Sequence, residues 1–330
     1  MLSSIRPVPA LTIILSSALL LAGCSSSDQQ DGANPSEGGA TIEVEDNNGT
    51  QTVNAPPESV VALDNRTFET LSDWGVELSA GAVSLMPETN DYTQDDSILD
   101  IGSHNEPDLE SIVAAEPDLV INGQRFSQYQ DDITDLVPDA PAPVLDPREG
   151  EPFDSELKRQ TEVLGEVFEK QDEAAQTTDE FDSAIDRVGA AYDEGDTVMA
   201  VTTSGGEIGY LAPGVGRTLG PVFDIFGLTP ALEVDDASDD HQGDDISVEA
   251  IADSDPDWIL VMDRDAAVAA DEAEYEPAED ILSGSEALSG VTAVEEEQIV
   301  HMPADTYTNE GIQTYTEFFE TLADALEEQG

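Results

Sequence analysis

The chain has 330 residues, of which 74 are acidic and 10 are basic, for a formal net charge of −64. Hydrophobic residues make up 39% of it, enough for a folded core, which excludes a disordered polyanion. So negative a chain makes nucleic acid and anionic membrane surfaces poor partners, and it repels itself unless salt screens the charges. With a single cysteine, neither an intramolecular disulfide nor a cysteine-based zinc site is possible.

The first predicted element is an export signal that ends at this cysteine. Arg6 precedes an apolar run over residues 8–21, and the sequence Leu-Ala-Gly-Cys closes at Cys24. This order is typical of a secretory signal and is too short for an ordinary membrane span. The ending resembles the lipobox of bacterial lipoproteins, whose cysteine is acylated and becomes the new N-terminus. The alternative is a common secretory signal with a chance cysteine.

The lipobox implies a signal peptide over residues 1–23 and a lipid such as palmitate on Cys24. A flexible tether over residues 24–40, composed mainly of Ser, Gly, Asp, Gln, Asn and Pro, would then hold the protein on the extracytoplasmic face of the cell membrane. The acidic composition resembles that of an exported protein from a halophilic bacterium.

The folded part is expected to begin near Thr41 with a β-hairpin. Residues 41–45 alternate like a strand, Asp-Asn-Asn-Gly is a turn signal, and residues 50–53 return as the second strand. A buried strand over 60–63 and a helix over 68–74, ended by glycine, follow.

An internal repeat carries the next prediction. Residues 106–121 and 245–261 each read as a helix, a Pro-Asp corner and a buried strand. Strands that alternate with helices indicate parallel βαβ construction. Two such copies predict two similar lobes, over 41–150 and 191–330, since a domain typically holds ~100–150 residues.

Between the copies, the connecting segment 151–190 has the apolar period of a helix over residues 153–190. One long helix would fix the spacing of the lobes, although Gly165 and the polar residues around Gln171 are able to break it in two. The second lobe is predicted to start with a strand over 197–202 and to end with a helix over 314–328.

From Thr41 onward, this layout resembles the iron-siderophore and cobalamin binding proteins of bacterial ABC importers. The paired segments Glu-x-Ile-x-x-x-x-Pro-Asp, which start at Glu110 and Glu249, carry the resemblance. It implies an α/β fold with two Rossmann-like lobes joined by a long helix and a ligand cleft between the lobes. Four short sequence segments most resemble those of proteins that bind ferric catecholate siderophores: residues 121–125, 213–217, 223–228 and 261–264.

Three arginines are the main candidates for binding the ligand. Arg125, Arg217 and Arg264 follow predicted buried strands or lie in a Gly-rich loop. The carboxyl ends of parallel strands face the ligand crevice, and guanidinium groups suit an oxygen-rich anion such as a ferric catecholate. The alternative for each is a pair with a local acid. We assign Arg148, Arg159 and Arg187 to the outer surface.

The resemblance also implies roles for a histidine and a tyrosine. Catecholate binders of this type carry a histidine at the place of His241 and a tyrosine near that of Tyr307, and this pair can ligate ferric iron where the siderophore leaves sites open. A solvated loop position is the alternative for His241. His104 is expected to line the cleft. His301, Trp74 and Trp258 are interpreted as structural.

Two matched acids are expected to contact a permease. Glu110 and Glu249 occupy equivalent positions in the two copies of the repeat. In the family, one acid on each lobe docks onto the permease dimer of the ABC transporter. The alternative is an acid that favours the start of a helix, and both interpretations can hold together. We expect a monomer that has no cofactor apart from its ligand.

Three other functions stay open. A cobalamin or haem binder of the same family would need a more apolar cleft with fewer arginines. A binder of free zinc or manganese would use the three histidines, which are widely dispersed. A secreted halophilic enzyme is the third, but the sequence has no Gly-x-Ser-x-Gly, no His-Glu-x-x-His and no Walker phosphate loop. The sequence therefore favours a binding protein over an enzyme.

Replacing the lone cysteine tests the lipid anchor. Cys24→Ser is expected to abolish acylation, because the hydroxyl cannot take the place of the cysteine sulfur. Metabolic labelling with a fatty acid measures this directly. A variant labelled as strongly as the unmodified protein would contradict the lipoprotein interpretation.

Overall fold

The computed structural model describes residues 40–329. The predicted signal peptide over 1–23, Cys24 and all of the predicted tether except its last residue lie outside the described residues, so these expectations stay predictions. In residues 40–329, no helix is long and apolar enough to cross a membrane.

The predicted hairpin is confirmed. Strand β1 (Ala40–Asp46) pairs antiparallel with β2 (Gly49–Ala55), with Asp46 opposite Gly49. The Asp46 carboxylate accepts a hydrogen bond of 2.8 Å from the backbone N–H of Asn48, which closes the turn. Asn47 at its tip donates to the carbonyl of Asp146, so the hairpin is tied to the segment that precedes the connecting helices.

The N-terminal sheet has four parallel strands in the order β5-β4-β3-β6. Three-residue strands β3 (Val60–Ala62) and β6 (Leu119–Ile121) are buried throughout, as expected for a sheet covered on both faces. The other two strands are β4 (Ala80–Gly81), which pairs with β3, and β5 (Leu99–Asp100), at the edge of the sheet. The accompanying helices are α1 (Phe68–Asp73), η1 (Val83–Leu85), η2 (Asp91–Gln94), α2 (Leu109–Ala114), η3 (Gln124–Tyr129) and α3 (Gln130–Leu136).

The C-terminal sheet has the order β11-β10-β7-β8, and β9 also pairs with β7. All pairs are parallel except that of β7 with β8. Its strands are β7 (Thr197–Ser204), β8 (Glu207–Tyr210), β9 (Thr229–Pro230), β10 (Trp258–Asp263) and β11 (Ile299–His301). The helices of this half are α6 (Gly220–Phe226), α7 (Val248–Ser254), α8 (Arg264–Val268), α9 (Ala278–Gly284), α10 (Thr292–Glu295), η4 (Thr306–Thr308) and α11 (Ile312–Gln329).

Both copies of the repeat are a helix, a corner and a buried strand, as predicted. The aspartate of each Pro-Asp corner accepts a hydrogen bond from the backbone at the start of the neighbouring strand. Asp118 accepts a hydrogen bond of 2.8 Å from the backbone N–H of Ser59, just before β3. Asp257 accepts one of 2.7 Å from the N–H of Thr197, the first residue of β7. Each corner therefore fixes the register of two neighbouring parallel strands.

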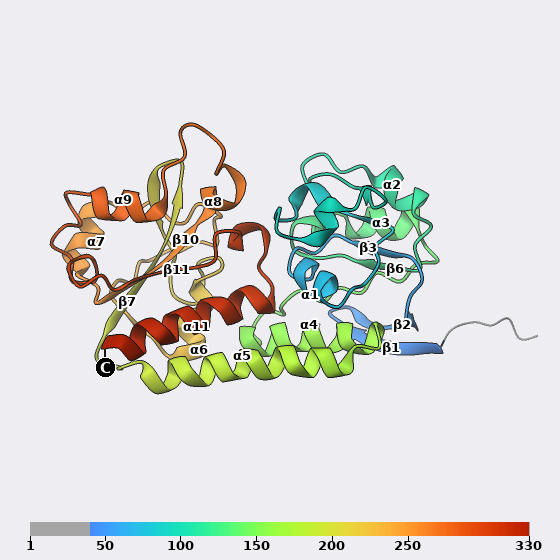
Figure 1. Cartoon of the computed structure of the whole chain (residues 1–330), viewed down its shortest axis with the longest axis horizontal. Coiled ribbons are helices and arrows are strands. Elements are labelled where there is room, and N and C mark those ends of the chain that lie inside the picture. The colour runs from blue at the N-terminus through green and yellow to red at the C-terminus, as the bar shows by residue number, and fades with distance from the viewer. Residues whose placement is uncertain (1–39, 330) are drawn as a thin grey trace, which may run out of the picture. The chain divides into compact units, whose positions relative to one another are not determined.

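The connecting segment is long but consists of two helices, α4 (Phe153–Val167) and α5 (Gln171–Ala191). Gly165 allows them to pack, because a Cβ at this position would lie 2.6 Å from the Cβ of Ala174. Helix α5 also lies along α11, as Figure 1 shows. The domain limits at residues 150 and 190 stay predictions.

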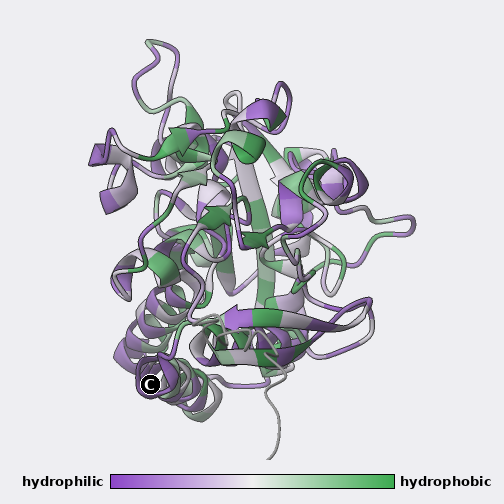
Figure 2. Cartoon of the chain, turned by 90° about the vertical axis from the view of Figure 1, so that its right-hand side faces the viewer, coloured by the Kyte–Doolittle hydropathy of each residue, from purple (hydrophilic) through white to green (hydrophobic). Residues whose placement is uncertain are grey.

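Three clusters of buried apolar side chains form the core. Trp74 and Trp258 are 7% and 3% exposed, which agrees with their interpretation as core residues. The rings of Phe181 on α5 and Phe319 on α11 stack with their centroids 5.6 Å apart. Figure 2 shows hydrophobic residues on the inner strands and hydrophilic residues on the outer helices and loops.

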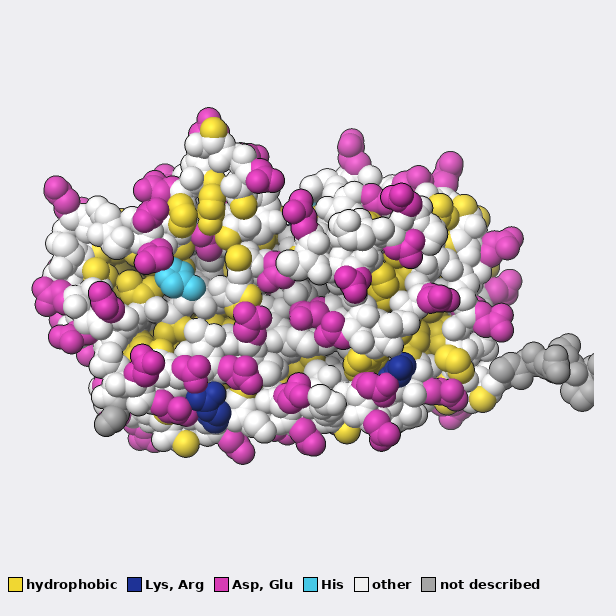
Figure 3. Space-filling model, viewed as in Figure 1, with side chains coloured by type: hydrophobic (Ala, Val, Ile, Leu, Met, Phe, Trp, Pro, Cys, Tyr) yellow, Lys and Arg dark blue, Asp and Glu magenta, His cyan; other side chains and the backbone are white. Residues whose placement is uncertain are grey.

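Salt is expected to stabilise this fold. Acidic side chains spread over the visible face in Figure 3, with very few basic ones among them. Their mutual repulsion grows in dilute buffer, where the Debye length rises from about 10 Å at 0.1 M to roughly 30 Å at 0.01 M. Circular dichroism should show a thermal midpoint that rises with salt. Equal midpoints in dilute buffer and in molar salt would contradict this expectation.

Candidate functional site

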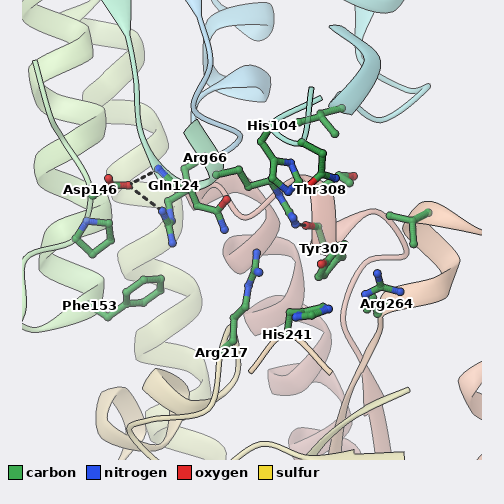
Figure 4. Close-up of a pocket in the computed structure, with 15 residues that line it drawn as sticks. Arg66, His104, Gln124, Asp146, Phe153, Arg217, His241, Arg264, Tyr307 and Thr308 are labelled. Atoms are coloured by element: carbon green, nitrogen blue, oxygen red, sulfur yellow. Dashed lines mark hydrogen bonds and ion pairs between the residues drawn. The ribbon is translucent and has the colours of Figure 1, made fainter. Parts of the chain in front are cut away.

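A cavity of about 810 Å³ brings the predicted site residues together. It lies between loops of the N-terminal and C-terminal halves, and Figure 4 shows Arg66, Arg217, Arg264, His241 and Tyr307 around it. The full lining is Arg66, Leu85, His104, Asn105, Gln124, Arg125, Asp146, Pro147, Phe153, Arg217, His241, Arg264, Val268, Tyr307 and Thr308. All six residues predicted to bind the ligand are among them.

Three arginines surround the ring of Tyr307. The guanidinium carbons of Arg125, Arg217 and Arg264 lie 4.4, 5.0 and 4.8 Å from its centroid, within the range of cation–π attraction. Arg125 belongs to η3, which follows β6, and Arg264 begins α8 at the end of β10. The strand ends thus deliver these cations to one point, as parallel sheets do with ligand-binding groups.

The three arginines differ in how their charge is compensated. Arg217 binds Glu310 through two hydrogen bonds, of 3.0 Å from Nε and 3.1 Å from a terminal nitrogen. Arg264 lies 2.9 Å from the carboxylate of Asp265. Arg125 instead donates to the main-chain carbonyl of Tyr307 at 2.7 Å and forms no ion pair with any described residue. The alternative of a pair with a local acid therefore applies to Arg264, whereas Arg217 pairs with an acid distant in sequence and Arg125 pairs with no acid among the described residues.

Arg66 is a fourth arginine of the cavity, which the sequence analysis missed. It lies three residues beyond the predicted strand 60–63, and its guanidinium is 3.2 Å from the carboxylate of Asp146. The rule that selected the other arginines, a cation just past a buried strand, would have found it. Gln124, Asp146, Phe153 and Thr308 were also missed. Gln124 lies in the stretch 121–125 that supports the resemblance, and no sequence motif distinguishes the other three.

Two buried carboxyl groups lie beside these cations. Burial raises the pKa of Glu310, but Arg217 and Arg66 outweigh this effect and hold the pKa below its usual value. Glu310 therefore stays ionised. At the end of β3, burial raises the pKa of Asp64 to about 6, with Asp146 adding to the rise while Arg66 and Gln160 oppose it.

Several buried donors at the cavity lack a partner among the described residues. They are Nε of Arg66, Arg125 and Arg264, together with Nδ1 of His104, whose hydrogen-bonding state depends on its tautomer. Buried polar atoms are normally paired, so unpaired ones call for an explanation. All four atoms belong to residues that line the cavity, and so many donor groups suit a ligand that is rich in oxygen acceptors.

The histidines and Tyr307 have distinct environments. Burial, Arg125 and Arg217 all lower the pKa of His104, which keeps the imidazole neutral. His241 is more open, with 47% of its side chain exposed, and its Nδ1 lies 3.7 Å from the Asp240 carboxylate. Burial raises the pKa of the Tyr307 phenol, but Arg125, Arg264 and Arg217 outweigh it and lower the pKa overall. His301 lies on β11, outside the cavity lining, where burial lowers its pKa.

The remaining candidates lie elsewhere. Glu110 and Glu249 are exposed, each is the second residue of its helix, α2 or α7, and neither lines the cavity. Cys24 lies outside the described residues. Among residues 40–329, no three His, Cys, Asp or Glu side chains are arranged to hold a metal ion.

Of the three arginines assigned to the outer surface, Arg148 and Arg187 match the assignment, with 46% and 39% of their side chains exposed. Arg159 does not, because its side chain is only 18% exposed. Arg148 and Arg159 both bind the carboxylate of Glu156, a side chain only 2% exposed, and so compensate a buried charge. Arg159 also donates to the carbonyls of Leu145 and Asp146, which holds α4 against this segment.

Comparisons with known proteins point in one direction. The family model described as periplasmic binding protein matches residues 60–306. The petrobactin-binding protein YclQ of Bacillus subtilis is 25% identical over 96% of this chain and 98% of its own length. The ferric-anguibactin-binding protein FatB of Vibrio anguillarum is 28% identical, over 78% of this chain and 79% of its own.

Among solved structures, the catecholate-siderophore binding protein VctP of Vibrio cholerae has a TM-score of 0.74 at 22% identity, with 86% of this chain and 99% of that one covered. The siderophore binding protein BauB, solved with two acinetobactin molecules and ferric iron, also has a TM-score of 0.74, at 23% identity, with 87% and 99% covered. This likeness shows the predicted α/β fold of two lobes.

Proposed function

Because the chain belongs to the periplasmic binding protein family, we propose that it captures a ferric siderophore, of the catecholate type, and delivers it to an ABC permease. In this proposal the protein is a monomeric solute-binding protein, not an enzyme. Cys24 would anchor it through a lipid on the extracytoplasmic face of the membrane.

The observation that carries the proposal is a cationic cavity in an anionic protein. The whole chain has 10 basic residues, and four of them line this one cavity. A ferric catecholate is a compact anion whose oxygens accept hydrogen bonds. Planar guanidinium groups stay charged at every physiological pH and offer several donors to such a ligand.

His241 and Tyr307 are proposed to complete the coordination of the iron where the siderophore leaves positions open. Both line the cavity, and the neighbouring arginines favour the ionised form of the Tyr307 phenol, which is the form that binds ferric iron. The iron is part of the ligand and arrives already chelated. His104, held neutral, would contact the organic part of the complex.

The named relatives support this class of ligand. One is named for petrobactin and one for ferric anguibactin, and a structural neighbour is described as a catecholate-siderophore binder. The runner-up is a cobalamin or haem binder of the same family, and the four arginines weigh against its more apolar ligand. Family membership weighs against a secreted enzyme.

Arg125 is the cleanest position at which to test the cavity. It compensates no buried acid among the described residues, so Arg125→Gln should spare the fold. Hydrogen bonds to charged groups contribute ~1.5–3 kcal/mol each, so affinity for a ferric catecholate should fall roughly ten- to hundred-fold. Arg125→Lys should restore part of the loss, since the charge returns without the planar fork. Quenching of tryptophan fluorescence on titration measures the affinity.

The matched control is Arg187→Gln, which removes an exposed arginine remote from the cavity and should leave affinity unchanged. Arg148 and Arg159 are unsuitable controls because their loss would leave Glu156 buried and unpaired. If Arg125→Gln binds as tightly as the control, the catecholate proposal fails and the cobalamin-type ligand takes first place.

Substituting the two matched acids should impair transport without weakening ligand binding. Glu110→Ala and Glu249→Ala are expected to keep full affinity for the ligand, because neither side chain lines the cavity, while cellular iron import falls. Measuring affinity on the purified variants and uptake in cells tests both halves. Normal uptake by the double variant would remove these acids from the permease contact.

A further inference from the structure

Glu310 is a buried carboxylate at the back of the candidate site. It lies between η4 and α11, and its side chain is 3% exposed. Besides Arg217, it accepts hydrogen bonds of 2.9 Å from the Thr218 hydroxyl and 3.0 Å from the Gln124 side-chain amide, and Arg66 lies 4.0 Å away. One carboxylate thus joins groups from both halves of the protein.

Two of these partners have an uncommon backbone conformation. Gln124 has φ +46° and Thr218 has φ +69°, in the left-handed region that side-chain-bearing residues rarely adopt. Gln124 directly precedes Arg125, and Thr218 directly follows Arg217. Such conformations persist where the surroundings hold them, and they gather at functional sites. Glu310 binds the side chains of both residues.

We propose that Glu310 is a positioning residue, which holds Arg217 directly and Arg125 through the turn at Gln124, so that both guanidinium groups meet over the ligand cavity. The inference rests on the proposed function for its biological meaning. The geometric part concerns this chain's own residues and can be measured without any ligand.

The direction in which affinity changes distinguishes a positioning role of Glu310 from the effect of its negative charge alone. Replacing Glu310 by glutamine removes one negative charge beside the arginines, and by Coulomb attraction alone this would strengthen the binding of an anion. A positioning role predicts the reverse, because the arginines lose the group that fixes their geometry. A fall in affinity therefore cannot come from the change of charge.

The ligand-free test uses nitrogen-15 NMR of the arginine Nε–H groups. Seven arginines occur in residues 40–329, so each signal can be assigned by single Arg→Lys substitutions: Arg66, Arg125, Arg148, Arg159, Arg187, Arg217 and Arg264. In Glu310→Gln, the signals of both Arg217 and Arg125 should shift. A shift confined to Arg217 and Arg66 would overturn the proposal, since Glu310 would then be only a local ion-pair partner.

The chain offers a matched control. Glu327 binds Arg187 with the same two-bond geometry, at 3.1 Å from Nε and 2.9 Å from a terminal nitrogen, far from the cavity lining. Glu327→Gln should shift only the Arg187 signal.

A second variant keeps the test decisive if Glu310→Gln folds poorly. Gln124→Gly removes the amide that binds Glu310 but suits the left-handed backbone, so it should not destabilise the protein. It should shift the Arg125 signal and leave that of Arg217 in place. An unchanged Arg125 signal would contradict the link through Gln124.

The affinity of each variant for a probe ligand, ferric 2,3-dihydroxybenzoate, is then measured. Glu310→Gln should weaken binding about ten-fold, similar to Arg217→Gln, and the double variant should bind no more weakly than either single one, because the pair acts as a unit. Additive losses, or tighter binding by Glu310→Gln, would overturn positioning. If the unmodified protein does not bind the probe, this counts against the catecholate proposal, while the NMR result still decides the role of Glu310.

Discussion

A cluster of positive charge inside a strongly negative protein is the constraint on which the rest of the site depends. Arg66, Arg125, Arg217 and Arg264 line one cavity, although their guanidinium groups repel one another and lose water there. Three buried or half-buried acids, Asp146, Glu310 and Asp265, compensate three of them. Arg125 has no such partner among residues 40–329, so a bound anion would complete the balance.

The fold supplies this cluster through the ends of its parallel strands. Each Pro-Asp corner ties one strand to the start of its neighbour, Asp118 to β3 and Asp257 to β7. The register fixed in this way places the residues after β3, β6 and β10 at the same cavity. Helices α4 and α5 pack closely through Gly165, and α5 packs along α11, whose first turn adjoins Glu310. The repeat thus fixes the positions of the strands, and the segments that follow the strands carry the arginines of the cavity.

Local patterns predicted much of this from the sequence. The hairpin, both copies of the repeat and three of the cavity arginines follow from turn residues, periodicity and position after a strand. Arg66 obeys the same rule and was overlooked. Glu310 is different: it meets Arg217 across 93 positions of sequence, and among 74 acids nothing local marks it. Arg159 was assigned to the outer surface for a related reason, because its burial beside Glu156 arises only from tertiary packing.

The central claim is that this cavity selects an anionic, oxygen-rich ferric complex, and a direct competition tests it. The protein is mixed with equal amounts of a ferric catecholate, haem and cobalamin, separated from free ligand by gel filtration, and its visible spectrum is recorded. The account predicts that the charge-transfer band of the ferric catecholate stays with the protein, because only this ligand matches the four arginines lining the cavity. A protein fraction that carries the haem or cobalamin spectrum instead would contradict it.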